Sequence, residues 1–165
     1  MSIRSILRYP APQLSESCKP VSVFDDSLKN LCADLLHTMR AAPGVGITAP
    51  HIGEMLRVSV IQLSPEEKVH YHINPSILSA SGGMQRFTEG SVSMPGMTDE
   101  VERPSHIHFR YQDLEGVFHE EEADGFLATC IQHEIDQLDG IFWIKRLSRL
   151  KRDRILKKWD KQNLR

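Results

Sequence analysis

The sequence predicts a single α+β domain, because helical segments and a central group of strands follow one another without a regular strand–helix repeat. Of the 165 residues, 40% are hydrophobic and 25% are charged, which is typical of a soluble globular protein. The sequence has no internal repeat and no change of composition that would mark a second domain. We therefore expect residues 1–165 to form one unit.

Two helices are predicted from hydrophobic spacing and from residues that begin or end helices. Between Asp25 and Pro43, apolar residues recur at intervals of three and four, as on the buried face of an amphipathic helix. A second helix is expected from about Asp124 to Leu138, with Gly140 just past its end as a C-terminal cap. These two helices should pack against the strands.

The middle of the chain is predicted to form strands. Segments 56–63 and 69–74 are rich in β-branched or alternating residues, and in 105–112 apolar and polar residues alternate. The turn at 114–116 is expected to join 105–112 to 117–123 as a hairpin. The alternation also predicts that four strand histidines face solvent: His70, His72, His106 and His108.

The C-terminal segment 145–165 is strongly basic and is predicted to be helical, with Ser148 as its N-cap. It has ten Lys or Arg and two Asp or Glu, which gives it a charge of +8. Because the net charge of the whole chain is −2, the rest of the chain carries −10. Such a segment can bind phosphate-rich partners, or it can simply be a solvated helix face. We expect its apolar residues to form the buried stripe: Leu150, Ile155, Leu156 and Trp159.

The cysteines and the first residues of the chain indicate a cytoplasmic protein. Cys18, Cys32 and Cys130 form no CxxC pair and are odd in number, so we expect reduced thiols. The first ten residues contain no apolar run typical of a secretory signal, and no stretch is long enough to span a membrane. We also expect no sequence-specific binding to nucleic acid.

The segment QHEIDQLDG (132–140) differs by one letter from the HExxH signature of metal-binding helices. In that signature two histidines lie one helical turn apart and reach one metal ion, while the glutamate acts on the metal-bound water. Here His133 and Glu134 are present, but Gln137 occupies the position of the second histidine. Taken alone, the segment is therefore incomplete.

Two further motifs lie upstream in a characteristic order: GVGITAPHIG (44–53) and EGSVSMPG (89–96). Together with QHEIDQLDG they resemble the three ordered motifs of bacterial peptide deformylases, approximately GxGLAAxQ, EGCLS and QHExDHLxG. The resemblance covers roughly residues 3 to 160. It implies a deformylase-like fold, in which antiparallel sheets surround a central HExxH-type helix and a further helix follows at the C-terminus.

The resemblance also implies a role for each matching position. Deformylases remove the N-formyl group from the methionine of nascent chains with Fe²⁺, for which Zn²⁺, Ni²⁺ or Co²⁺ can substitute. The implied metal positions are Ser91, His133 and Gln137, of which only His133 retains its ligand. Glu134 corresponds to the catalytic acid/base, and His51 and the backbone N–H of Val92 correspond to the donors that hold the oxyanion. Two groups of residues complete the comparison: a supporting ion pair, Glu89 with Arg103, and a substrate pocket, Gly46, Phe126, Thr129 and Cys130.

The substitutions predict that classical deformylation is abolished or reduced to a trace. A serine hydroxyl stays protonated near neutral pH, and an amide oxygen is a weak ligand compared with imidazole. We therefore expect no metal, or a weakly bound divalent metal. Two functions stay open: a pseudoenzyme that binds a peptide N-terminus or the ribosome, and a rewired hydrolase that uses Glu134, His133 and His51. The hydrolase would either bind a metal through His51 and His133 or work without one. Cys130 is either a packed thiol or a substitute ligand.

Overall fold

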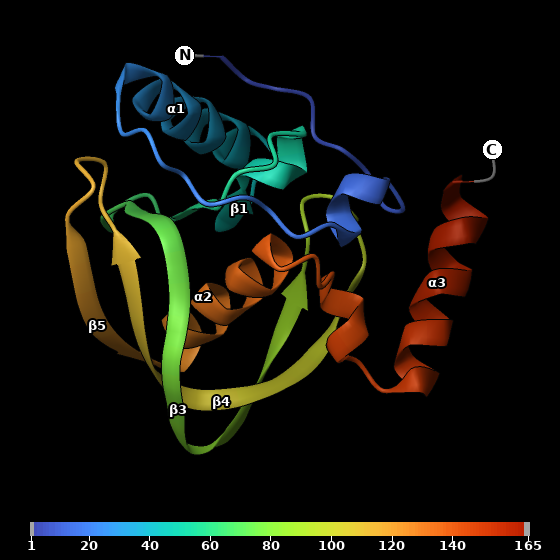
Figure 1. Cartoon of the computed structure of the whole chain (residues 1–165). Helices are drawn as coiled ribbons and strands as arrows, with labels where there is room; N and C mark the ends of the chain where they lie inside the picture. The colour runs from blue at the N-terminus through green and yellow to red at the C-terminus, as the bar shows by residue number, and fades with distance from the viewer. Residues whose placement is uncertain (1, 164–165) are drawn as a thin grey trace.

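The computed structural model describes residues 2–163, which form one antiparallel sheet, three α-helices and three short 3-10 helices (Figure 1). The α+β prediction is confirmed, and the described strands belong to one sheet rather than several. Neighbouring strands in the sheet are also neighbours in the sequence: β1 (Gly46–Thr48), β2 (Val58–Ile61), β3 (His70–Gly90), β4 (Thr98–Gln112) and β5 (Phe118–Asp124).

The long β3–β4 pair bends around the helix α2 (Gly125–Leu138), as Figure 1 shows. The pairing of β3 with β4 changes register at three places between Ile73 and Met84, and such bulges increase the local bend of a strand. The predicted hairpin is confirmed, because β4 and β5 pair antiparallel around the turn at 113–117. The bend places the end of β3 beside the middle of α2.

The predicted helix ends are confirmed. Helix α1 (Asp26–Ala41) begins after Asp25, whose carboxylate accepts the backbone N–H groups of Ser27 and Leu28. Helix α2 is followed by Gly140 at φ +80°, and a Cβ there would lie 2.8 Å from the carbonyl oxygen of Ser15. Both the backbone conformation and the close approach require glycine at this position.

The C-terminal helix α3 (Arg149–Asn163) is shorter than the basic segment that was predicted. Ser148 caps it, since its hydroxyl accepts the backbone N–H of Lys151 at 3.3 Å. A separate 3-10 helix, Trp143–Arg146, contains the first two residues of the basic segment, and residues 164 and 165 lie outside the described range. Leu150 was wrongly assigned to the buried stripe, because it lies in the first turn and is 69% exposed, whereas Ile155 and Trp159 are buried.

The prediction that the strand histidines face solvent is wrong for His72. Its side chain is buried beside the rings of Phe109 and Tyr111, because it lies on the face of the sheet covered by other elements. Burial is the main reason why the pKa of His72 falls to about 3. His106 and His108 are half-buried and pair with glutamates of β5 across the strand pair.

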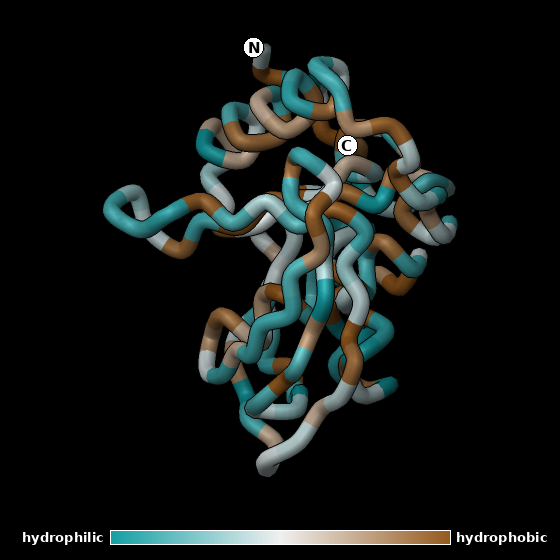
Figure 2. Tube along the Cα trace, turned by 60° about the vertical axis from the view of Figure 1, so that its left-hand side comes forward, coloured by the Kyte–Doolittle hydropathy of each residue, from teal (hydrophilic) through white to brown (hydrophobic). Residues whose placement is uncertain are grey.

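The hydrophobic residues form three clusters: one between α1, β1 and β2, one between β4, β5 and α2, and one beneath the C-terminal elements. Figure 2 shows hydrophobic and hydrophilic residues mixed along the trace. No helix in residues 2–163 is long and apolar enough to cross a lipid bilayer. The three cysteines are buried and unpaired, as predicted.

Candidate functional site

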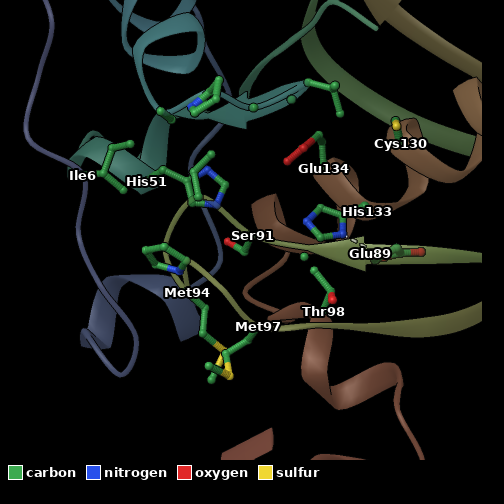
Figure 3. A pocket seen from close by; sticks show the side chains of 18 of the residues that line it. Ile6, His51, Glu89, Ser91, Met94, Met97, Thr98, Cys130, His133 and Glu134 are labelled. Atoms are coloured by element: carbon green, nitrogen blue, oxygen red, sulfur yellow. Dashed lines mark hydrogen bonds and ion pairs between the residues drawn. The ribbon is translucent and has the colours of Figure 1, made fainter. Parts of the chain in front are cut away.

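A pocket of about 690 Å³ lies where α2 meets β1 and the loop that follows β3 (Figure 3). It brings together residues that are far apart in the sequence and belong to all three motifs. Nine of the ten predicted site residues line it: Gly46, His51, Ser91, Val92, Phe126, Thr129, Cys130, His133 and Glu134. The tenth, Gln137, does not.

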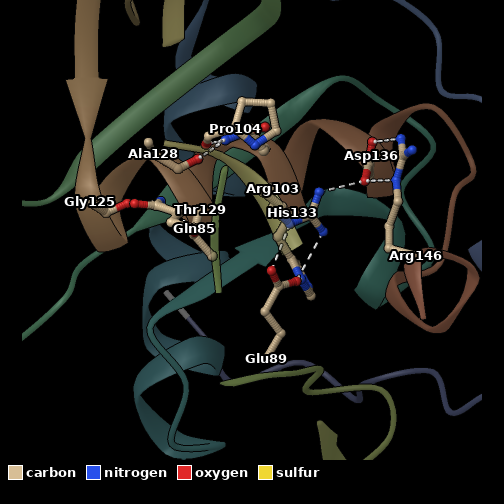
Figure 4. Close-up of polar contacts among 11 residues, drawn as sticks. Gln85, Glu89, Arg103, Pro104, Gly125, Ala128, Thr129, His133, Asp136 and Arg146 are labelled. Atoms are coloured by element: carbon tan, nitrogen blue, oxygen red, sulfur yellow. Dashed lines mark hydrogen bonds and ion pairs between the residues drawn. The ribbon is translucent and has the colours of Figure 1, made fainter. Parts of the chain in front are cut away.

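His133 is held from behind by a buried network of charges (Figure 4). Its Nδ1 lies 2.8 Å from the carboxylate of Glu89, which also accepts two hydrogen bonds from Arg103 at 2.7 and 3.0 Å. Burial favours a higher pKa for Glu89, but the hydrogen bonds from His133 and Arg103 outweigh it and lower this pKa. The predicted ion pair between Glu89 and Arg103 is therefore present, and it fixes the orientation of the His133 ring.

The network continues to residues that the sequence did not point to. Arg103 also donates to Asp136 at 2.9 Å, and Arg146 makes two hydrogen bonds of 2.8 Å to the same carboxylate. No sequence spacing links Asp136 to Arg146, because the contact depends on how the chain turns after α2. Two arginines and two carboxylates thus balance each other's charge behind the pocket.

Glu134 is buried beside His133 and lies against the backbone of β1. A Cβ added to Gly46 would lie 2.7 Å from Oε2 of Glu134, so any larger residue here would have to displace this buried carboxylate. Burial raises the pKa of Glu134 to about 7, although the nearby His133 acts in the opposite direction. Near neutral pH this carboxyl group can therefore both accept and release a proton, as a general acid or base must.

His51 is the third residue of the short 3-10 helix Ala49–Ile52 and is 1% exposed. Its Nδ1 is 2.9 Å from both the backbone N and the hydroxyl oxygen of Thr48, which form a capping box with it. Burial is the main reason why the pKa of His51 falls to about 3, so the ring is neutral at physiological pH. The TxxH spacing of Thr48 and His51 is compatible with this box.

The two substituted positions have structural contacts of their own. Ser91 lines the pocket, and its hydroxyl oxygen accepts the backbone N–H of Ser93 at 3.0 Å. Gln137 is buried, and its Nε2 donates to the carbonyl oxygen of Leu14 at 2.8 Å. Gln137 therefore serves to attach the N-terminal segment to α2.

The side chains present do not fit a divalent metal of the iron or zinc type. Within residues 2–163, no group of three or more His, Cys, Asp or Glu side chains is arranged to hold a metal ion. Such sites normally use three protein ligands with imidazole, thiolate or carboxylate donors. Cys130 lies in the pocket wall, and burial raises the pKa of its thiol far above the ordinary value, so without a metal ion it stays protonated.

The remaining pocket residues form its walls. Thr129 accepts a hydrogen bond of 3.0 Å from Gln85, which also donates to the carbonyl of Gly125, so this polar wall is attached to β3. Phe126 packs against Phe87, with 5.3 Å between ring centroids. The backbone N–H of Val92 finds no acceptor among the described residues. Gln85 lies outside the three motifs and could not be identified from its sequence position.

Comparisons with a family model, with known sequences and with solved structures indicate the same family. A family model described as polypeptide deformylase matches residues 3–153. A peptide deformylase-like protein of Agrobacterium fabrum is 63% identical over 161 residues, which are 98% of each chain, and a peptide deformylase of Phenylobacterium zucineum is 45% identical over 98% of this chain and 97% of its own. The solved structure of a peptide deformylase from Legionella pneumophila, which is 40% identical, superposes with a TM-score of 0.91 over 97% of this chain and 95% of its own.

Proposed function

Because this chain belongs to the peptide deformylase family, we propose that it binds the N-terminal segment of a peptide and removes a formyl group at most in trace amounts. The family is a family of metalloenzymes, whereas this chain retains one of the three implied ligands, His133. The observation that carries the proposal is Gln137. Its Nε2 donates to the carbonyl oxygen of Leu14, and the residue does not line the pocket, which supports an incomplete set of metal ligands.

The free edge of β1 supports binding of an extended peptide. In the β1–β2 pair the carbonyl of Val45 accepts the N–H of Gln62, so the alternation of antiparallel strands directs the N–H and C=O of Gly46 away from β2. β1 is the last strand of the sheet on this side, and Gly46 lines the pocket. A peptide that adds to this edge would place its first side chain near Phe126 and Thr129.

The experiment that tests this proposal measures binding and turnover separately. Isothermal titration with formyl-Met-Ala-Ser measures binding, and a coupled formate assay on the same protein measures hydrolysis. We expect saturable binding and no more than a trace of formate, also after addition of Fe²⁺, Ni²⁺ or Co²⁺. Absence of binding at millimolar peptide, or rapid release of formate, would refute the proposal.

A second candidate is a hydrolase that works without the family's metal site. The feature that favours it is Glu134, since its pKa near 7 suits proton transfer beside His133 and His51. In such an enzyme Glu134 would activate water and His51 would face the carbonyl oxygen. The nearly isosteric Glu134→Gln variant tests it, because hydrolysis of any amide or ester should disappear, and an unchanged rate would exclude this candidate.

We further propose that α3 contacts a phosphate-rich partner such as the ribosome. Its buried residues Ile155 and Trp159 hold it against the body of the protein, and Trp159 donates to the carbonyl of Tyr9. Most of its cationic side chains are exposed: Arg149, Arg154, Lys157, Lys158 and Lys161. Cosedimentation with ribosomes should weaken steeply as salt rises, and in the Lys157→Glu/Lys158→Glu variant. Salt-independent cosedimentation would contradict this.

A further inference from the structure

The N-terminal segment 3–8 lines one side of the pocket and contributes two arginines to it, Arg4 and Arg8. Arg4 is paired, because its guanidinium lies 3.3 Å from the carboxylate of Asp34 and 3.1 Å from that of Glu54. The side chain of Arg8 is exposed, and it makes no hydrogen bond or ion pair with any residue in the range 2–163. The pocket wall therefore contains a positive charge that no carboxylate of the described chain neutralises.

The backbone on both sides of Arg8 is fixed by hydrogen bonds to two parts of the site. The N–H of Leu7 donates to the carbonyl oxygen of His51 at 2.8 Å, and the N–H of Tyr9 donates to the carbonyl oxygen of Ser93 at 2.9 Å. Arg8 is thus held between the 3-10 helix Ala49–Ile52 and the loop that follows β3. Because the backbone is already in place, binding of a ligand has to order only the side chain of Arg8, which keeps the entropic cost small.

The residues of this segment line the pocket in alternation. Ile6 and Arg8 line it, whereas Leu7 and Tyr9 do not. Tyr9 instead packs on the body of the protein, where its ring stacks on another aromatic ring at 5.1 Å between centroids. Figure 3 shows Ile6 on the side of the pocket opposite Glu134. Arg8 therefore belongs to the wall that faces the retained residues of the site.

The two carboxyl groups that line the pocket do little to repel an anionic ligand. The charge of Glu89 is compensated by two hydrogen bonds from Arg103 and by the contact with His133. Burial raises the pKa of Glu134 to about 7, so this group is partly uncharged near neutral pH. The unpaired charge that the pocket offers to a ligand is therefore the positive charge of Arg8.

We infer that Arg8 selects ligands that carry a carboxylate, which its guanidinium binds while the N-terminal end of the ligand lies near His133 and Glu134. A guanidinium presents its N–H donors in a planar arrangement that matches the two oxygens of a carboxylate. This carboxylate can belong to an acidic side chain or to the free C-terminus of a short peptide. The inference rests on the proposed peptide-binding function for the rest of the ligand, whereas the carboxylate site itself does not depend on it.

The first test compares the affinities of three peptides by isothermal titration: formyl-Met-Ala-Ser, its C-terminal amide, and the amide of formyl-Met-Ala-Asp. The free acid, the aspartate peptide or both should bind about threefold to tenfold more tightly than the neutral amide, and the one that does so identifies the source of the carboxylate. Arg8→Gln should lose this preference and bind the neutral amide as before, while Arg8→Lys should keep part of it. The control Lys19→Gln, which removes one positive charge outside the pocket, should keep all of it. Equal affinities for the three peptides, or a preference that survives Arg8→Gln, overturn the inference.

The second test separates the inference from the proposed function, because its probes carry no formyl group. In ¹H–¹⁵N NMR spectra recorded at mildly acidic pH, the Nε–H signal of Arg8 is assigned by its loss in Arg8→Gln. Acetyl-aspartate amide should shift this signal saturably, whereas acetyl-asparagine amide, which has the same shape without the charge, should not. A shift with acetyl-aspartate amide but no binding of any formyl peptide would remove the proposed function and leave the carboxylate site. Formyl peptides that bind with equal affinity and leave the Arg8 signal unchanged would do the opposite.

Discussion

Restoring the two lost ligands with Ser91→Cys and Gln137→His should convert this chain into a metal-binding protein at a measurable cost in stability. The cost comes from Gln137, whose 2.8 Å hydrogen bond to the carbonyl of Leu14 would be lost in a buried setting. An unsatisfied buried group costs about 1–3 kcal/mol. For a domain of this size, 1 kcal/mol corresponds to a fall of about 2–4 °C in Tm, so the metal-free double variant should melt roughly 2–12 °C lower.

Metal should reverse this loss in the double variant alone. Loss of a residue that merely supports a ligand lowers metal affinity about 10–100-fold, so restoration of two direct ligands should raise it by at least about 100-fold. A metal present at about 100 times its Kd stabilises the folded protein by about 2.7 kcal/mol. Addition of Ni²⁺ should therefore return the double variant to about its original Tm, while the natural chain should not respond.

The assay combines thermal unfolding with and without Ni²⁺, metal content after gel filtration, and release of formate from formyl-Met-Ala-Ser. Ser91→Cys and Gln137→His as single variants are the controls, and each should bind metal more weakly than the double variant. If the natural chain binds one equivalent of metal tightly, the argument from ligand chemistry is wrong. If the double variant binds none, the substituted side chains do not reach one common point, and the pocket has changed its shape beyond its ligands.

Three further predictions concern buried groups. Glu134 is more readily protonated when folded, with a pKa of about 7, so its stabilising effect is complete below pH 4.5 and is lost as the pH rises through 7. Glu134→Gln should therefore be more stable than the natural chain at pH 8, by about 1–3 kcal/mol in urea unfolding, and the difference should vanish near pH 4.5. For His51 and His72 the pH dependence of stability has the opposite sign, because their pKa values are about 3 in the folded state. Each favours the folded state above pH 6.5 and should reduce the free energy of unfolding by up to about 1.4 kcal/mol per pH unit below it. His72→Phe, measured in the Glu134→Gln background, should make this acid dependence less steep, and an unchanged slope would contradict the burial argument. Gly46→Ala should cost about 1–3 kcal/mol and weaken peptide binding, because the new Cβ meets Glu134, whereas the matched control Gly83→Ala, with nothing within 4 Å of its Cβ, should do neither.

Local signals predicted the helices well because the causes are local. Asp25 and Gly140 act on groups within a few residues of themselves, so their effect can be read from the sequence. The 21-residue strand β3 was not predicted at its full length, because its register shifts depend on pairing with β4. Burial of His72 was missed for a similar reason. Alternation divides a strand into two faces, but the elements that cover each face come from elsewhere in the chain.

The site was predicted unevenly. The three motifs identified six residues that line one pocket, and the resemblance also indicated three more pocket residues on α2 and the pair of Glu89 with Arg103. The direction of Gln137 could not be predicted, since its partner Leu14 is 123 residues away in the sequence. The capping box between His51 and Thr48 depends on hydrogen-bond geometry that only the folded chain defines.

The substitutions at the implied metal and oxyanion positions are integrated into the fold, and this argues against simple decay of an enzyme. Ser91 accepts the N–H of Ser93, Gln137 attaches the segment around Leu14, and His51 completes a capping box. Behind the pocket, the buried charges around Glu89 still orient His133, although buried ion pairs carry a large desolvation cost and hydrophobic replacements are often as stable. A scaffold that only had to stay folded would have little need of that network. A pocket that must present His133, Glu134 and fixed donors to a ligand does need it, because such groups bind selectively only when they are held in place before the ligand arrives.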